Sequence, residues 1–174
     1  LKEIGGPEVP SYLMPHGTYT CSPDHLKEIA TLANESRSCI HIHVSENEHE
    51  NHDVRERYGK TPTEVLESSG ILNSHTVYGH GVHLSPADVT TLAEHGGAVA
   101  HCPGSNLKLA SGIADVSNYR KNGLKVGLGV ASNLHLGLRL FGGKALQLLN
   151  QLSLADLRSR AEAELRFEAR VPSW

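Results

Sequence analysis

Short apolar runs alternate with stretches of helical character through the middle of the sequence. Helix starts are marked by a hydroxyl residue, a proline and a carboxylate at Thr61–Glu64 and Ser85–Asp88, and more weakly at Ser22–Asp24. These signals predict helices at about residues 23–34, 62–69, 86–95 and 115–122. The runs between them predict strands at Tyr12–Pro15, Cys39–Val44, Thr76–Gly79, Gly97–His101 and Lys125–Gly129.

Strands that alternate with helices are typical of β-α-β units, so we expect an α/β fold with a parallel sheet. The alternation of strand and helix patterns ends after residue 134, and four apolar residues beyond it follow helical spacing: Leu154, Leu157, Ala161 and Leu165. We therefore expect residues 1–134 to form the α/β part of the chain and residues 135–174 to form a helical segment, with its helix over 135–171.

The strand at Cys39–Val44 carries histidines on one face only. Successive strand residues point to opposite faces, so Ile40, Ile42 and Val44 share one face, and Cys39, His41 and His43 share the other. A central parallel strand is normally apolar on both faces because helices cover it. Two histidines on one face therefore need water, a metal ion or a hydrogen-bonding partner beside them.

Histidines recur at the carboxyl ends of the predicted strands, at His16, His43, His80 and His101. Any one of them, taken alone, is better explained as a hydrogen-bonded core or loop residue. Their recurrence favours function, because the carboxyl ends of parallel strands carry the active site in α/β folds. Glu46, three residues beyond His43, could reach the same cleft as an acid or base beside a metal ion.

Other polar residues fit a solvated surface. Glu46 belongs to the acidic run Glu46–Glu50 and could simply be a solvated surface residue. For the other charged residues of this run and for His52, a solvated surface position is the interpretation that we prefer. The residues that we expect at the surface are Glu48, His49, Glu50, His52, His25, His75 and His95.

Composition narrows the class of protein. Of 174 residues, 16 are Lys or Arg and 19 are Asp or Glu, so the net charge of −3 lacks the basic footprint of a nucleic-acid binder. Three scattered cysteines, Cys21, Cys39 and Cys102, form no disulfide framework or CxxC pair. No apolar run approaches the roughly 18 residues of a membrane span, and no leader is evident, so we expect a soluble, cytoplasmic protein.

Four segments carry a family resemblance: Pro15–Cys21 (PHGTYTC), Ile42–Glu46 (IHVSE), Gly79–Leu84 (GHGVHL) and His101–Gly112 (HCPGSNLKLASG). In this order they resemble the amidohydrolase superfamily, and most of all its branch of methylthioadenosine/S-adenosylhomocysteine deaminases and chlorotriazine hydrolases. The resemblance implies a metal-dependent (β/α)8 TIM-like barrel that hydrolyses C–N bonds of small purine-like or triazine-like molecules. The implied cofactor is a divalent metal, zinc first, with iron or manganese as alternatives.

The resemblance also implies roles for individual residues. His43 resembles the metal ligand of the fifth strand, and His80 resembles the sixth-strand histidine that orients the water at the metal or approaches the ion as a second ligand. Glu46 resembles the acid/base that contacts and protonates the substrate ring. His16 resembles a histidine that contacts the sugar hydroxyls of a nucleoside, and Ser132 resembles a substrate-contacting serine after the eighth strand.

The family pattern has two features without a counterpart in this sequence. The first is the HxH pair of the first strand, so we expect the chain to correspond to about strands four to eight. The second is the aspartate after the eighth strand, because Gly127–Gly129 runs straight into Val130–Ser132. The predicted function is deamination of purine nucleoside-type substrates.

The same residues fit three alternative functions. One is a chlorotriazine or other ring amidohydrolase, and another is a catalytically incomplete remnant that only binds a ligand or partner. A third is a histidine-rich protein that sequesters metal on surface residues such as His49 and His52. Assembly into a homo-oligomer is a further possibility.

Overall fold

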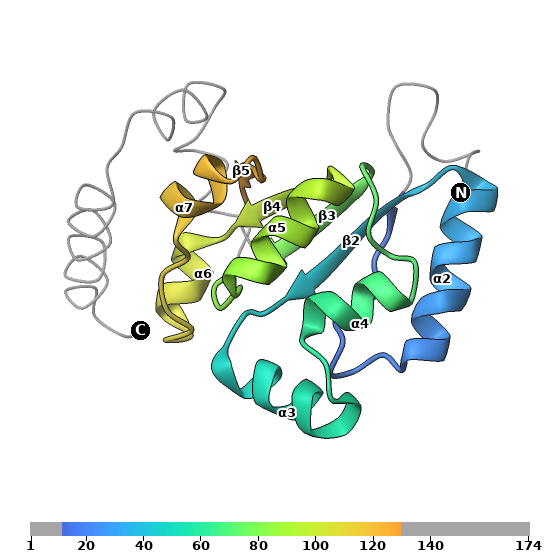
Figure 1. The fold of residues 1–174 in the computed structure, drawn as a ribbon, viewed down its shortest axis with the longest axis horizontal. Helices are drawn as coiled ribbons and strands as arrows, with labels where there is room; N and C mark the ends of the chain where they lie inside the picture. The colour runs from blue at the N-terminus through green and yellow to red at the C-terminus, as the bar shows by residue number, and fades with distance from the viewer. Residues whose placement is uncertain (1–11, 130–174) are drawn as a thin grey trace, which may run out of the picture.

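A computed structural model describes residues 12–129 of the chain (Figure 1). Ser132 and the helix predicted over residues 135–171 lie outside the described residues. Within the described range, no helix is long and apolar enough to cross a membrane.

Five parallel strands form one sheet in the order β1-β2-β3-β4-β5. The strands are β1 (Tyr12–Leu13), β2 (Cys39–Val44), β3 (Thr76–His80), β4 (Ala98–His101) and β5 (Lys125–Leu128). The strand order follows the chain without reversal, as in a barrel, whereas doubly wound sheets reverse order at a switch point. The predicted parallel α/β class is confirmed, and the strand order agrees with the predicted part of a TIM-like (β/α)8 barrel.

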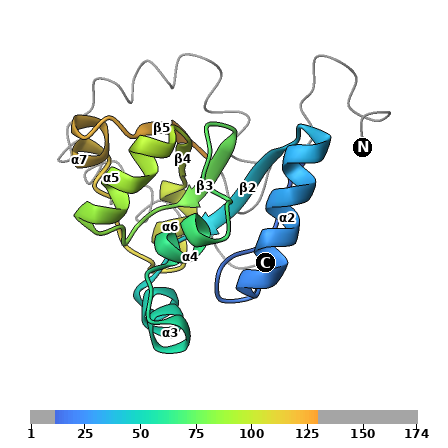
Figure 2. The ribbon, with the colours of Figure 1, turned by 45° about the vertical axis from the view of Figure 1, so that its right-hand side comes forward.

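Helices α2, α4 and α5 lie on one side of the sheet (Figures 1 and 2). The described helices are α2 (Pro23–Ser36), α3 (Glu48–Tyr58), α4 (Pro62–Ser68), α5 (Pro86–His95), α6 (Pro103–Lys108) and α7 (Val116–Lys121). Hydroxyl caps and a proline in the first turn begin α2, α4 and α5, as predicted. The Thr61 hydroxyl also donates to Asp88 Oδ1 at 2.7 Å and so joins the caps of α4 and α5.

The alternation predicted for β2 is confirmed. Ile40, Ile42 and Val44 are buried against the helices, whereas His41 and His43 on the opposite face are only half-buried. The helix side of the sheet contacts apolar residues from successive helices: Leu26, Val65, Leu66, Val89, Leu92, Val116 and Tyr119. Burial of these side chains holds the sheet in place, at about 25 cal/mol per Å² of apolar surface. It leaves the histidine face on the inner side of the partial barrel.

The first predicted strand proves shorter than expected, with two residues in place of Tyr12–Pro15. Proline has no amide hydrogen and cannot donate to a sheet ladder, which accounts for the early end at Leu13. The structure also contains two helices that the sequence reading did not predict, α3 and α6. Both follow strands directly, so both help to build the carboxyl end of the sheet.

The chain reverses at the end of β3 through two residues with left-handed backbone, His80 (φ 68°) and Gly81 (φ 55°). The buried Tyr119 hydroxyl of α7 donates to Gly81 O at 2.7 Å. Burial raises the pKa of Tyr119 to about 12, so the hydroxyl keeps its proton at neutral pH. From the other side, the Gly81 amide donates to Val44 O at 3.0 Å. The reversal is therefore held by both β2 and α7.

Replacing Tyr119 by Phe should lower the free energy of unfolding by about 1–3 kcal/mol, because it leaves the carbonyl of Gly81 buried without its donor. Urea unfolding followed by circular dichroism measures the change. The matched control is Tyr12→Phe at an exposed tyrosine of β1, which should leave stability within about 0.5 kcal/mol. Equal effects of the two substitutions would contradict the role given to Tyr119.

Candidate active site at the strand ends

The register of the sheet brings His43 beside a glycine. His43 of β2 is paired with Gly79 of β3, and the two positions lie on the same face. A Cβ atom at Gly79 would lie 3.0 Å from His43 Cδ2, which is closer than ordinary packing allows. The absence of a side chain at position 79 therefore makes room for the imidazole over the inner face of β3.

A backbone carbonyl fixes the tautomer of the neutral His43 ring. His43 Nδ1 lies 2.8 Å from His16 O, and a carbonyl can only accept, so Nδ1 carries the hydrogen. The backbone amide of His43 donates to the same oxygen at 3.0 Å. Nε2 of His43 is therefore left with its lone pair, which is the state that a metal ion or a proton donor can use.

The ring of His16 lies over the same edge, with its centroid 5.1 Å from that of His43. Its Nδ1 is 3.1 Å from the hydroxyl of Thr20, and the residue is exposed. The backbone carbonyl of His16 therefore accepts a hydrogen bond from the His43 ring, while the imidazole of His16 is accessible to solvent or to a small molecule.

The left-handed backbone of His80 brings its ring to the histidine face. The centroids of the His43 and His80 rings are 5.1 Å apart, and His80 is only 2% exposed. Its Nδ1 lies 2.6 Å from Oδ1 of Asn106, a fully buried residue of α6. A left-handed conformation costs a residue other than glycine about 1–3 kcal/mol, so the contacts around His80 must offset that strain.

Glu46 completes the group. Its Oε1 lies 3.6 Å from His80 Nδ1, and its side chain is 15% exposed. The residue before it, Ser45, has φ 47°, so the chain turns sharply after β2. The structure therefore brings together His16, His43, Glu46 and His80, as the sequence predicts, from the ends of three neighbouring strands.

Glu50 is buried, and the prediction that it lies on a solvated surface is therefore wrong. It is 3% exposed, and its carboxylate accepts from the Glu46 amide at 2.8 Å and from the Thr18 hydroxyl at 3.3 Å. Burial raises the pKa of Glu50, and these hydrogen bonds partly offset that effect. Glu50 joins the loop after β1 to the loop that carries Glu46.

Only the start of α3 has a signal in the sequence. Asn47 caps α3 by accepting from the Glu50 amide at 2.9 Å, which is the spacing of a capping box. The remaining polar residues of the run behave as expected, because Glu48, His49 and His52 are exposed. His25 and His75 are exposed too, and His95 is half-buried.

Two further histidines flank the group as neutral imidazoles. His101, at the end of β4, is buried, and burial, with a smaller electrostatic effect of the neighbouring His80, lowers its pKa to about 4. Its Nδ1 has no hydrogen-bond partner among residues 12–129. The pKa of His41 is lowered by burial and by His43 and His80. Both rings therefore stay uncharged at neutral pH and add no repulsion to a bound cation.

The donors at the strand ends fit part of a metal site. His43 and His80 offer imidazole nitrogens, the commonest metal ligands in proteins. Among residues 12–129, however, three ligand atoms come within 4.8 Å of one another only at His52, Asp53 and Glu56 on α3. The strand ends therefore supply imidazoles without completing a three-ligand set from the described residues.

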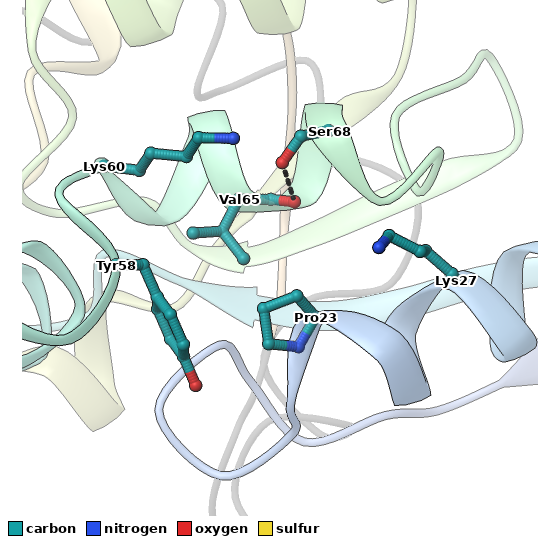
Figure 3. A pocket seen from close by; sticks show the side chains of 6 residues that line it. All are labelled: Pro23, Lys27, Tyr58, Lys60, Val65 and Ser68. Carbon is teal, nitrogen blue, oxygen red and sulfur yellow. Dashed lines mark hydrogen bonds between the residues drawn. The ribbon is translucent and has the colours of Figure 1, made fainter.

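A separate cavity of about 270 Å³ lies between α2, α4 and the end of α3 (Figure 3). Its lining residues are Pro23, Lys27, Tyr58, Lys60, Val65 and Ser68. Lys27 is already paired with Asp24 at 3.0 Å. None of the strand-end histidines lines this cavity, so it is not part of the candidate active site.

Comparison with known proteins agrees with this geometry, since residues 3–171 match the Amidohydrolase family. The chain belongs to the amidohydrolase family. Among curated relatives of this amidohydrolase chain, a 5-methylthioadenosine/S-adenosylhomocysteine deaminase of Archaeoglobus fulgidus is 52% identical over 121 residues. The match covers 70% of this chain and 29% of that protein, so the chain spans less than a third of the relative's length.

Solved structures of similar fold include an adenosine deaminase from Xanthomonas campestris with bound zinc. It has a TM-score of 0.70 and 29% identity, and the match covers 74% of this amidohydrolase chain and 29% of that one. An atrazine chlorohydrolase from Arthrobacter aurescens, complexed with zinc and atraton, has a TM-score of 0.69 at 24% identity and so shows the fold alone. That match covers 75% of this chain and 30% of the other.

Glu50 should make stability depend on pH. Because its pKa is raised, the folded state binds a proton at a higher pH than the unfolded chain does. The free energy of unfolding of the wild type, relative to Glu50→Gln, should therefore rise as pH falls through the raised pKa, and level off below the ordinary carboxyl range.

Urea unfolding at a series of pH values measures this difference. The control is Glu48→Gln, at an exposed position of the same helix, which should show no such rise. A difference between wild type and Glu50→Gln that is flat, or that falls toward acid, would contradict the burial argument.

Proposed function

We propose that the barrel to which this chain belongs is a metal-dependent aminohydrolase that deaminates purine nucleoside-type substrates, such as 5-methylthioadenosine and S-adenosylhomocysteine. The convergence of His43, His80 and Glu46 at the strand ends carries the proposal. The 52% identity to a deaminase of that specificity supports the choice of substrate.

In this proposal, His43 and His80 are the residues of the described chain that hold the metal. The hydrogen bond to His16 O keeps the Nε2 lone pair of His43 available, which fits a ligand. When bound, a divalent ion activates water for C–N hydrolysis. Zinc is the first candidate because the adenosine deaminase structure described above contains it, and iron or manganese would suit the same imidazole donors.

Glu46 is the proposed acid/base. Its carboxylate lies beside His80 and is partly exposed, so it can contact both His80 and the ring of a bound substrate. It would take a proton from the attacking water and deliver it to the ring nitrogen during addition, and would then take the proton of the added hydroxyl and deliver it to the departing amine. The hydrogen bond from the Glu46 amide to Glu50 holds the backbone of this residue while the side chain transfers protons.

His16 and Ser132 are the proposed substrate contacts. The exposed imidazole of His16 stands at the rim of the group and can bind sugar hydroxyls. Ser132 lies outside the described residues, so its role is inferred from the family resemblance alone. The proposed partners of the chain are therefore the metal and a small-molecule substrate.

A non-catalytic, ligand-binding role is the second candidate. It is favoured by one observation: the described strand ends do not bring three ligand atoms together. The two candidates differ in whether Glu46 matters to a chemical step, and that difference can be measured directly.

Glu46→Gln should reduce kcat for ammonia release from 5-methylthioadenosine by roughly 10²- to 10⁴-fold, the usual contribution of general acid/base catalysis. The purified full chain is assayed with its metal content determined in parallel. Glu48→Gln, a nearby exposed carboxylate, is the control and should keep the wild-type rate.

Equal rates for Glu46→Gln and wild type would contradict the acid/base role. Binding of the nucleoside without ammonia release would favour the binding role, and turnover of triazines alone would transfer the activity to that substrate class. Metal binding that survives His43→Ala but is lost in His52→Ala would place the ion on α3 instead.

A further inference from the structure

Asn106 is a fully buried polar residue in direct contact with the candidate active site. It lies on α6, immediately after β4, and its Oδ1 is 2.6 Å from His80 Nδ1. Asn106 has no role in the proposed acid/base, metal-binding or substrate-binding steps. A buried amide is costly unless its hydrogen bonds are made, so its position calls for an explanation.

The atoms around His80 Nδ1 determine which ring nitrogen carries the hydrogen. Two oxygens face Nδ1: Asn106 Oδ1 at 2.6 Å and Glu46 Oε1 at 3.6 Å. A carboxylate attracts an N–H and repels a lone pair, so the hydrogen belongs on Nδ1 and is donated to Asn106 Oδ1. Nε2 then keeps the lone pair, as it does in His43.

Asn106 is itself held rigidly through its backbone. Its amide donates to Cys102 O at 2.9 Å, and its carbonyl accepts from the Ser111 amide at 2.7 Å. Ser111 O in turn lies 2.6 Å from Nε2 of His83, in the loop that follows His80. The segment after β4 therefore contacts a histidine at the end of β3 and a second one in the loop that follows, and these bonds hold the backbone of Asn106 in place.

We propose that Asn106 is a positioning residue that holds His80 in the tautomer with hydrogen on Nδ1 and so directs a free Nε2 lone pair to the active site. The use of this lone pair, to bind the metal ion, rests on the proposed function. The tautomer itself is a property of the chain and can be observed without metal or substrate.

The test is ¹⁵N nuclear magnetic resonance of the imidazole nitrogens in the full chain, recorded without added metal or substrate. The signals of His80 are assigned by their loss in His80→Asn, because asparagine tolerates left-handed backbone. In the wild type, Nδ1 should resonate as a protonated nitrogen and Nε2 as an unprotonated one. Hydrogen on Nε2 of the wild-type ring would overturn the proposal without any further variant.

Asn106→Ala should shift the His80 ring toward the tautomer with hydrogen on Nε2, because the acceptor at 2.6 Å is gone and Glu46 Oε1, at 3.6 Å from Nδ1, is beyond hydrogen-bond distance. Asn106→Asp keeps an oxygen at the same position and should keep hydrogen on Nδ1. The matched control is Asn122→Ala, which removes an exposed asparagine whose amide bonds only within and just beyond α7. It should leave the His80 signals unchanged.

An unchanged tautomer in Asn106→Ala would overturn the proposal, as would hydrogen on Nε2 in Asn106→Asp. If Asn106→Ala fails to fold, the wild type and Asn106→Asp still decide the question. In active protein, Asn106→Ala should also lower kcat by about 10- to 100-fold, the usual effect of removing a partner behind a ligand. If no substrate is turned over, the proposed function fails while the tautomer measurement remains decisive for Asn106.

Discussion

The reversal of the chain at the end of β3 is the constraint on which the candidate site depends. His80 adopts φ 68°, a conformation that a side chain other than glycine adopts only when its surroundings enforce it. Tyr119 from α7 and Asn106 from α6 bind the two residues of the reversal. Without this turn, the alternation of a strand would point the ring of His80 toward the helices, on the side of Val44. The strained backbone of His80 is thus what places its imidazole beside His43.

Much of this arrangement follows from the order of residues. Alternation in β2 separates His41 and His43 from the buried isoleucines, and parallel pairing places the ends of neighbouring strands at one edge. Those two facts predict that His43, His80 and Glu46 lie at one edge of the sheet, and the left-handed backbone of His80 then turns its ring to the face of His43. The pairing of His43 with a glycine is also readable once the register is known, because a larger residue would occupy the space of the ring.

The supporting residues could not be predicted in the same way. Glu50 belongs to a helix in which only Val54 and Glu50 itself are buried, so α3 lacks the apolar stripe by which amphipathic helices are recognised. Asn106 sits in a helix of six residues, too short to show a period. Both residues take their importance from neighbours that are distant along the chain, and only the folded structure reveals those contacts.

The carbonyl of Ser45 has a consequence for engineering this site. It accepts the amides of both Val82 and His83, at 3.0 and 2.9 Å, while the next amide along the chain, that of Glu46, is bound by Glu50. The loops that follow β2 and β3 are therefore joined by hydrogen bonds and depend on each other for their conformation. A loop graft from a related enzyme that exchanges only one of them would sever a shared acceptor, so chimaeras are best designed by moving the two connections together.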